Sequence, residues 1–213
     1  DEGPLDVGRA LHILLQIARS LREAHGQGVI HRDLKPANVF LIQHDDDGDF
    51  VKVLDFGLVK NLDEGDAEGL TKTGLFMGSP KYMAPEQIRG DRCTPATDVY
   101  ALGVLLYEML VGKVPFDRPN SANLLLAHVN DPVPSIQSVN PAVNVPPALE
   151  EIVYRCLSKA PEDRFQSMDE LILAVKHAGL MVTGFGPSLT SVTGEFRNSV
   201  SAPRAAASND IYV

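Results

Sequence analysis

Residues 31–38 restrict the fold of this chain more than any other segment. They place a carboxylate, a cation and an amide on one short stretch, as Asp33, Lys35 and Asn38. A second carboxylate, Asp55, follows an apolar run a short distance along the chain. Carboxylate and amide oxygens suit Mg²⁺, and a lysine neutralises negative charge on a phosphate group. The spacing therefore predicts a loop and a strand end that together hold a metal ion and phosphate.

Two short apolar runs, residues 39–42 and 51–54, flank the acidic stretch 44–49. Runs of this length on either side of a polar turn predict a β-hairpin with a solvated acidic tip. A calcium-binding loop is the alternative, but its spacing fails. With Gly48 at the sixth position, neither the first nor the twelfth position carries an acidic ligand.

Apolar residues recur at three- and four-residue steps in five segments, which predicts five helices. Asp6 is placed to cap the first, in which His12 and His25 are expected on the polar side. Pro95 suits a first turn and Gly112 a helix end, and the segment between them is apolar nearly all round, so it should be buried. The expected ranges are 5–26, 95–111, 121–129, 147–157 and 167–178, with Ser121 and Ser167 as caps of the third and fifth.

The composition is that of one globular domain, because 213 residues with 44% hydrophobic content can bury a core. A net charge of −9 argues against binding to nucleic acid, which needs clustered basic residues. Cys93 and Cys156 form no metal or redox spacing, which favours a reducing compartment. No apolar run is long enough to span a membrane, and no signal peptide is recognisable. We expect a cytoplasmic domain over 1–179 and a disordered, low-complexity tail or linker over 180–213.

Five motifs occur in a fixed order: residues 31–38, Asp55-Phe56-Gly57, Ala84-Pro85-Glu86, residues 98–103 and Asp163-Arg164-Phe165. Together they resemble the motifs of one protein family. The chain is similar to the large, C-terminal lobe of eukaryotic-type Ser/Thr protein kinases, and most of all to their bacterial branch. The resemblance implies an α+β, mainly α-helical fold with a short β-hairpin at the catalytic cleft. Bacterial relatives often continue into a membrane helix, so membrane anchoring of a longer parent protein is compatible with it.

The resemblance assigns the chemistry to four residues and the cofactors to ATP and Mg²⁺. Asp33 would accept the proton of the substrate hydroxyl and orient it, and Lys35 would neutralise charge on the transferred phosphoryl group. Asn38 and Asp55 would hold Mg²⁺. Ser79 resembles the residue that hydrogen-bonds Asp33 and Lys35 and helps to hold the protein substrate. Lys35 after Asp33 favours Ser/Thr over Tyr specificity.

Four residues in or near the motifs have implied roles in adenine contact or in packing. Phe40 would form the floor under adenine, with Leu54 near it, although plain core packing competes for both. His31 and Phe56, followed by Gly57, would form part of an internal packing stack. We therefore do not expect His31 to act as a base.

A regulatory role is implied for the long stretch 58–83, which has no clear periodicity. Arg32, directly before Asp33, resembles the arginine that pairs with a phosphate on this loop and orders it. Thr71 and Thr73 resemble the autophosphorylated threonines of bacterial kinases, with two solvated hydroxyls as the alternative.

Three further residues have implied structural roles. Glu86 and Arg164 would form a buried ion pair that anchors the end of the long loop. Asp98 would bind the backbone of residues 31–38.

The chain contains no Gly-rich loop, strand lysine or helix glutamate of a kinase small lobe. We expect the small lobe upstream in a parent protein, and little activity from this fragment alone. The expected function is ATP-dependent phosphorylation of protein Ser/Thr hydroxyls. A non-catalytic, kinase-derived interaction module is the alternative, and a substrate or decoy for another kinase is a weaker one. The complete set of catalytic side chains favours the enzyme.

Overall fold

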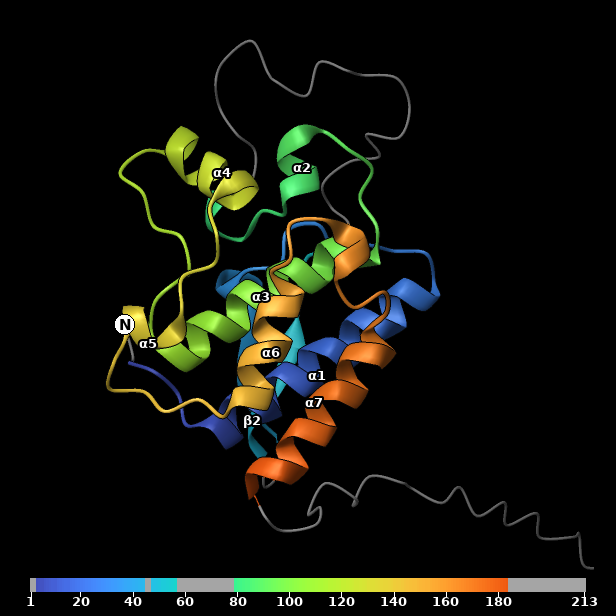
Figure 1. The fold of residues 1–213 in the computed structure, drawn as a ribbon. Coiled ribbons are helices and arrows are strands. Elements are labelled where there is room, and N and C mark those ends of the chain that lie inside the picture. The colour runs from blue at the N-terminus through green and yellow to red at the C-terminus, as the bar shows by residue number, and fades with distance from the viewer. Residues whose placement is uncertain (1–2, 45–46, 57–78, 184–213) are drawn as a thin grey trace, which may run out of the picture.

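The computed structural model describes residues 3–44, 47–56 and 79–183. Helices make up most of this part, with one two-stranded antiparallel sheet beside them (Figure 1). The mainly helical α+β fold is therefore as predicted. Gly57, Thr71, Thr73 and residues 184–213 lie outside the described residues.

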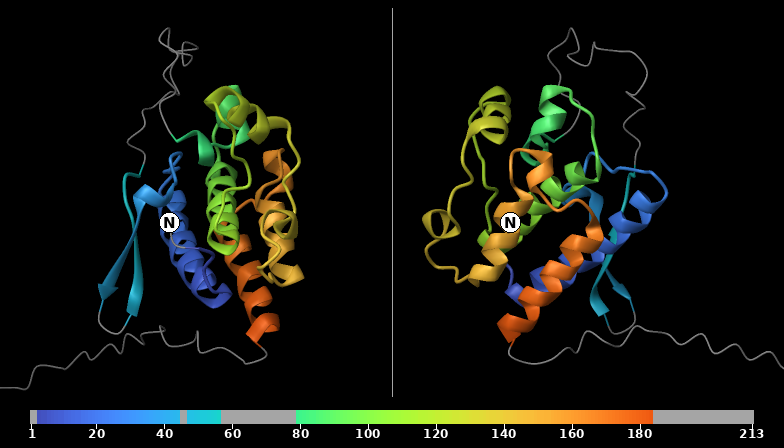
Figure 2. Two further views of the ribbon diagram at one scale, coloured as in Figure 1. Left: turned by 90° about the vertical axis from the view of Figure 1, so that its left-hand side faces the viewer. Right: turned by 45° about the vertical axis from the view of Figure 1, so that its right-hand side comes forward.

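The first helix, α1 (Val7–Gly26), begins two residues after the predicted start and ends at the predicted residue. The Asp6 carboxylate accepts hydrogen bonds from the backbone N–H groups of Gly8 and Arg9 at 2.8 and 3.3 Å, which confirms the predicted cap. One face of α1 is buried and packs against α3 (Pro95–Val111) and α7 (Met168–Thr183). Its other neighbour is the hairpin, so α1 separates the hairpin from the other helices (Figure 2, left).

The predicted hairpin consists of β1 (Val39–His44) and β2 (Asp47–Val53). The strands pair antiparallel with Val39 opposite Val53. A short 3₁₀ turn, η1 (Pro36–Asn38), leads directly into β1. Residue 38 therefore enters the hairpin, and residue 54 leaves it, at the same end of the sheet. This brings the end of the 31–38 stretch close to the chain segment that leads to Asp55.

The central helix is α3, with the predicted bounds and almost every residue buried. It ends because Gly112 adopts φ of 78°, a left-handed conformation that favours glycine. Gly103 lets α6 (Pro147–Cys156) approach closely, since a Cβ at this position would lie 2.5 Å from Cβ of Cys156. Because nearly every side chain of α3 is covered, this helix is a fixed platform for the segments that contact it.

Three predicted details are wrong. The cap of α4 (Ser121–Asn130) is Asn120, whose side chain accepts from the N–H of Asn123 at 2.8 Å, and not Ser121. The last helix, α7, continues to Thr183, beyond the predicted end at residue 178. A short helix before α6, α5 (Ile136–Val139), is capped by Ser135 and was not among the predicted helices.

Shorter elements complete the described part: η2 (Pro80–Tyr82), α2 (Pro85–Arg89) and η3 (Pro161–Asp163). Among the described helices, none combines the length and apolar content that a membrane span requires.

Candidate active site

A buried carboxylate at the start of α3 holds the backbone of the 31–38 loop. Oδ2 of Asp98 accepts from the N–H of His31 at 2.8 Å, and Oδ1 accepts from the N–H of Arg32 at 2.9 Å. The Asp98 side chain is 1% exposed, so both bonds are shielded from water. The loop is therefore fixed to the most buried helix of the molecule.

His25 contacts the same carboxylate, which the sequence did not predict. Its Nε2 lies 2.7 Å from Oδ2 of Asp98, and its side chain is only 9% exposed. The expectation of a solvated His25 on the polar side of α1 is therefore wrong. The two residues are far apart in sequence, so helical periodicity gives no signal for their contact.

Arg32 occupies a left-handed backbone conformation, with φ of 65°. Such a conformation is unfavourable for a residue with a Cβ and persists only where the surroundings impose it. Asp98 binds the N–H on one side of this residue. Gln87 binds the carbonyl on the other, donating from Nε2 at 2.7 Å while its Oε1 accepts from the N–H of Ala84 at 3.0 Å. Gln87 thus links the loop to the segment before α2, a role that we did not predict.

The ring of His31 is a packing element. Its Nε2 lies 2.9 Å from the carbonyl of Leu54, and Nδ1 accepts from the N–H of Asp33 at 3.3 Å. These two bonds together require a neutral ring protonated at Nε2. Its edge also meets the ring of Phe56, with centroids 4.9 Å apart. Since both ring nitrogens are occupied, no lone pair is left to act as a base.

Three polar side chains of the loop converge. Nζ of Lys35 lies 2.6 Å from Oδ2 of Asp33, and Nδ2 of Asn38 donates to the backbone carbonyl of Asp33 at 2.8 Å. The side chains of Asp33 and Lys35 are 23% and 25% exposed, so a substrate can reach them. The carboxylate and the ammonium group therefore face the same accessible space.

Asp55 lies next to this group. The N–H of Leu54 donates to the carbonyl of Asn38 at 2.9 Å, which joins the two strand ends. Asp55 is exposed and adopts φ of 61°, the second left-handed non-glycine residue of the described ranges after Arg32. Backbone strain at both residues, on either side of the polar cluster, is typical of functional sites.

Asn38 and Asp55 have the chemistry to bind Mg²⁺. Because Nδ2 of Asn38 is engaged with Asp33, the oxygen Oδ1 of the same amide is left as an acceptor. Within the described ranges, no three or more His, Cys, Asp or Glu side chains cluster as a metal site. A magnesium ion bound by one carboxylate, one amide, water and substrate phosphates does not need such a cluster.

Three further predicted site residues are Phe40, Leu54 and Ser79. Phe40 and Leu54 are 48% and 43% exposed, so the competing interpretation as core residues is wrong for both. Within residues 3–44 and 79–183, no hydrogen bond joins the side chain of Ser79 to Asp33 or Lys35. Lys35 instead contacts Asp33 directly.

Glu86 and Arg164 form a buried ion pair behind the loop. Their side chains are 3% and 0% exposed, and the guanidinium binds both carboxylate oxygens, at 2.7 and 2.8 Å. Burial alone would raise the pKa of the Glu86 carboxyl, but the hydrogen bonds and charge of Arg164 outweigh it and lower this pKa. The pair joins α2 to the segment after η3, so it fixes the position of the residues around Gln87.

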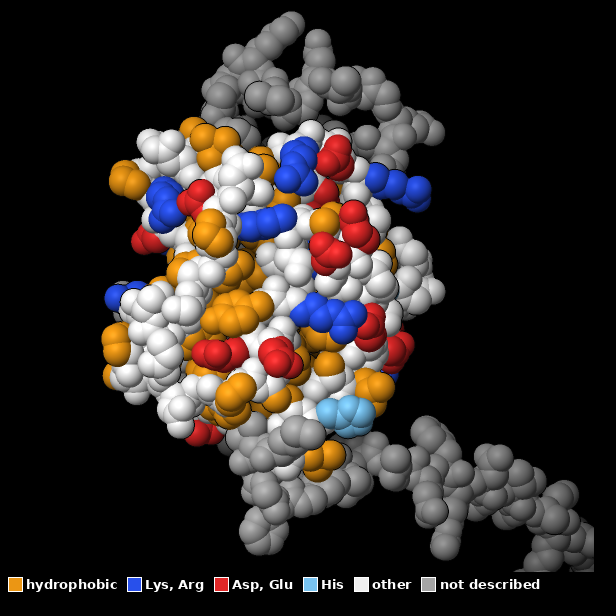
Figure 3. Space-filling view, in the orientation of Figure 1, with side chains coloured by type: hydrophobic (Ala, Val, Ile, Leu, Met, Phe, Trp, Pro, Cys, Tyr) orange, Lys and Arg blue, Asp and Glu red, His pale blue; other side chains and the backbone are white. Residues whose placement is uncertain are grey.

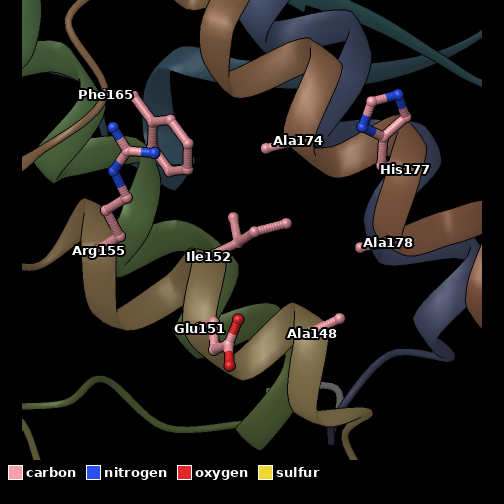
Figure 4. A pocket seen from close by; sticks show the side chains of 8 residues that line it. All are labelled: Ala148, Glu151, Ile152, Arg155, Phe165, Ala174, His177 and Ala178. Carbon is pink, nitrogen blue, oxygen red and sulfur yellow. The ribbon is translucent and has the colours of Figure 1, made fainter.

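A shallow groove of about 370 Å³ lies elsewhere, between α6 and α7 (Figure 4). Its walls are mostly apolar, and Arg155 stacks over the ring of Phe165 at one end, 4.1 Å from the ring centroid. Hydrophobic side chains are exposed over α6 on this face (Figure 3). None of the predicted catalytic or metal-binding residues lines the groove, so the polar cluster on the 31–38 loop is the candidate active site.

A carboxylate, an ammonium group and an amide on one loop, with a second carboxylate after the adjoining strand, are the kinds of side chain that phosphoryl transfer uses. The chain belongs to the protein kinase domain family, which matches residues 1–175.

Three curated relatives of the chain come from bacteria. The chain is 38% identical to serine/threonine-protein kinase pkn3 of Myxococcus xanthus over 209 residues, which is 98% of this chain and 36% of that protein. It is 44% identical to Pkn1 of the same organism over 165 residues, 78% of this chain and 23% of the relative. It is 39% identical to PknD of Mycobacterium tuberculosis over 176 residues, which is 83% of this chain and 25% of that relative. The chain therefore resembles the bacterial branch of eukaryotic-type kinases, as predicted, and spans 23% to 36% of the length of these relatives.

Proposed function

We propose that this chain supplies the catalytic loop and the metal-binding residues of a Ser/Thr protein kinase. The reaction is transfer of the γ-phosphoryl group of ATP to a protein Ser or Thr hydroxyl. The observation that supports this most is the convergence of Lys35 and Asn38 on Asp33 in an accessible position. A purely structural module has no physical need for this set, and a buried network that fixes its backbone is what catalysis by positioning requires.

In the proposed mechanism, Asp33 accepts a hydrogen bond from the substrate hydroxyl and turns its oxygen toward the γ-phosphorus. As the new P–O bond forms and the bond to the β-phosphate oxygen breaks, the hydroxyl proton passes to the Asp33 carboxylate. Lys35, already beside this carboxylate, stabilises negative charge on the phosphoryl oxygens. Asn38 keeps the Asp33 backbone in place through its amide N–H groups.

Oδ1 of Asn38 and the Asp55 carboxylate are the proposed ligands of Mg²⁺, which when bound offsets the charge of the ATP phosphates. The exposed rings and side chains of Phe40 and Leu54 are the proposed floor of the adenine site. Ser79 is proposed to contact the protein substrate. Arg32 is proposed to bind a phosphate on Thr71 or Thr73, a role that rests on the resemblance described above.

ATP phosphates need contacts that residues 1–213 do not offer, because no Gly-rich loop or strand lysine of the kinase type occurs in the sequence. We therefore propose that a small lobe elsewhere in a longer protein completes the site, and that the chain alone transfers little phosphate. Since the reaction consumes ATP, we propose that the domain works in the cytoplasm.

The test compares the full-length gene product with the isolated chain. Each is incubated with labelled ATP, Mg²⁺ and peptides in which Ser, Thr or Tyr is the single acceptor. The proposal predicts label on Ser and Thr but not Tyr, only with the full-length protein and only with Mg²⁺. Absence of transfer by the full-length protein would refute the kinase proposal, and efficient transfer by the isolated chain would refute the need for a small lobe.

A further inference from the structure

The side chain of Gln87, in α2, joins the proposed catalytic loop to the proposed substrate segment. Its Nε2 donates to the carbonyl of Arg32 at 2.7 Å, and its Oε1 accepts from the N–H of Ala84 at 3.0 Å. Ala84 is fully buried and ends the segment that begins at Ser79, the proposed contact of the protein substrate. Both ends of one amide group are therefore engaged, each with a different functional segment.

The bond to Arg32 acts on the peptide group that leads into Asp33. A peptide group is planar, so the carbonyl of Arg32 and the N–H of Asp33 turn together. Gln87 holds this group at the carbonyl, while Nδ1 of His31 accepts from the N–H at 3.3 Å. After Asp33, its own carbonyl accepts from Nδ2 of Asn38 at 2.8 Å. Side chains therefore fix the backbone on both sides of Asp33.

The conformation that Gln87 holds is a strained one. Arg32 has φ of 65°, which is unfavourable for a residue with a Cβ. Such a conformation persists only where neighbouring groups impose it. Asp98 accepts from the N–H of Arg32 at 2.9 Å and so fixes the peptide group before this residue. Gln87 fixes the peptide group after it, which is the one that sets the direction of the Asp33 side chain.

The residue before Gln87 keeps α2 in place. The Glu86 carboxylate is buried and binds the guanidinium of Arg164 at 2.7 and 2.8 Å. Two consecutive residues of α2 therefore have different tasks, because Glu86 anchors the helix and Gln87 reaches the loop from this anchored position. A donor on an anchored element holds its acceptor in one place, which catalysis by positioning requires.

Gln87 also has an ordinary structural explanation, as a cap of α2. It is the third residue of the helix, and accepting from the N–H of Ala84, directly before the helix, is one half of a capping box. A cap needs only the acceptor Oε1, however, and glutamate serves as well as glutamine at this position. The donor Nε2 has no task in capping, and it makes the shorter of the two bonds.

We propose that Gln87 is a positioning residue for phosphoryl transfer, which acts by holding the peptide group between Arg32 and Asp33 so that the Asp33 carboxylate faces the substrate hydroxyl. The inference rests on the proposed kinase function. Because the same amide binds Ala84, it also fixes the catalytic loop relative to the segment that starts at Ser79. In this role Gln87 affects the rate of transfer through Asp33 and leaves the binding of ATP unchanged.

Two substitutions separate the donor from the acceptor. Gln87→Glu keeps the shape of the side chain and the acceptor for Ala84, but it places an oxygen against the carbonyl of Arg32. Gln87→Met has nearly the same length and removes both groups. In the full-length protein, we expect both variants to lower kcat for a Ser/Thr peptide by about five- to twentyfold, the effect of one lost hydrogen bond, with repulsion added in Gln87→Glu.

The same two variants should differ in stability. Gln87→Glu preserves the cap, so its midpoint of urea unfolding should not fall, whereas that of Gln87→Met should. For Gln87→Glu, the KM values for peptide and ATP should stay within about twofold of wild type, because the loss is in the orientation of Asp33 and not in binding.

Gln137→Glu is the matched control. It makes the same exchange at an exposed glutamine of α5, whose Nε2 donates to the carbonyl of Val143 at 2.9 Å. This helix lies by the C-terminal end of α3, where Asn140 donates to the carbonyl of Val111 at 3.0 Å, whereas the catalytic loop is bound at the start of α3. Gln137→Glu should have the kcat of wild type.

A cap without a positioning role predicts a different pattern, in which Gln87→Glu is fully active and Gln87→Met is only less stable. A wild-type kcat for Gln87→Glu, or an equal fall in kcat for Gln137→Glu, would therefore overturn the proposal.

A second measurement does not depend on kinase activity. Hydrogen exchange of the Asp33 amide reports on the peptide group that Gln87 holds, and exchange of the Ala84 amide reports on the cap. We expect faster exchange at Asp33 in both Gln87 variants and faster exchange at Ala84 in Gln87→Met alone, with α3 unchanged. If the wild-type protein transfers no phosphate, the kinase proposal fails, while this pattern still decides whether Gln87 holds the loop. Wild-type exchange at Asp33 in both variants would overturn the proposal.

Discussion

Replacement of Arg164 by methionine should destabilise the fold more than any other single change in the buried polar network. The guanidinium is fully buried and makes two bonds to the Glu86 carboxylate. It also donates to three backbone carbonyls, at 2.7 to 3.0 Å, and stacks 4.9 Å from the centroid of the Tyr100 ring. Arg164→Met keeps much of the side-chain volume but leaves the carboxylate charged, buried and unpaired.

The magnitude follows from the burial of both partners. Removing one member of a buried pair destabilises a protein by about 3–5 kcal/mol, because the remaining charge is uncompensated. Total stability is about 5–15 kcal/mol for a typical domain. With a urea m-value of about 2 kcal/mol/M, the midpoint of unfolding should fall by roughly 1.5–2.5 M.

The pH dependence of this loss provides a sharper test. In the wild-type protein the pKa of Glu86 is lowered, so the pair stabilises the fold above the unfolded-state pKa and this contribution is lost as pH falls through the folded pKa. Arg164→Met removes both contributions of Arg164, and burial, the largest single cause, then raises the folded pKa of Glu86 against the smaller effects of the Thr97 and backbone hydrogen bonds. The penalty is then full at pH 7 and is relieved as the carboxylate takes up a proton at lower pH. The stability difference between the two proteins should therefore shrink on acidification.

The assay is urea unfolding of wild type, Arg164→Met and the double variant with Glu86→Gln, at pH 7 and pH 5. The double variant should recover part of the loss, since no unpaired charge is left. A difference between wild type and Arg164→Met below about 1 kcal/mol, or one that grows from pH 7 to pH 5, would refute the reasoning.

Three other predictions concern the fold and the loop. Gly103→Ala should destabilise the chain by about 1–3 kcal/mol in urea unfolding, because the new methyl group would overlap Cβ of Cys156; an unchanged midpoint would show that the two helices separate easily. Asp98→Asn replaces one carboxylate oxygen by an NH₂ group that would face a backbone N–H of the 31–38 loop, so both kcat and stability should fall. A wild-type kcat would show that Asp98 does not position this loop for catalysis. Phosphosite mapping of the active full-length protein should find phosphate on Thr71 or Thr73, and full activity with neither modified would exclude the proposed regulation.

Local signals made much of the fold predictable from the sequence. The bounds of α3 follow from Pro95 at its first turn and Gly112 at its end, and both effects are properties of the residues themselves. The hairpin and the cap at Asp6 follow in the same way. Where two capping residues adjoin, as at Asn120 and Ser121, local preference does not distinguish them, and only the structure shows that Asn120 is the cap.

Contacts between distant segments limited the prediction of the site. The family motifs identified Asp33, Lys35, Asn38 and Asp55, but they did not include the contact of His25 with the carboxylate at the start of α3. The bridging amide of Gln87 and the direct contact between Lys35 and Asp33 depend on side-chain geometry after folding. Periodicity and spacing carry no information of this kind.

The central claim is that Asp33 orients the hydroxyl that receives the phosphoryl group. Its most direct test is steady-state phosphotransfer to a Ser/Thr peptide by the full-length protein with Asp33→Asn, compared with Asp117→Asn as a matched control at an exposed position. The account predicts a fall in kcat of about 10²- to 10⁴-fold for Asp33→Asn, with the KM for ATP nearly unchanged and Asp117→Asn fully active. A kcat for Asp33→Asn within threefold of wild type would contradict it.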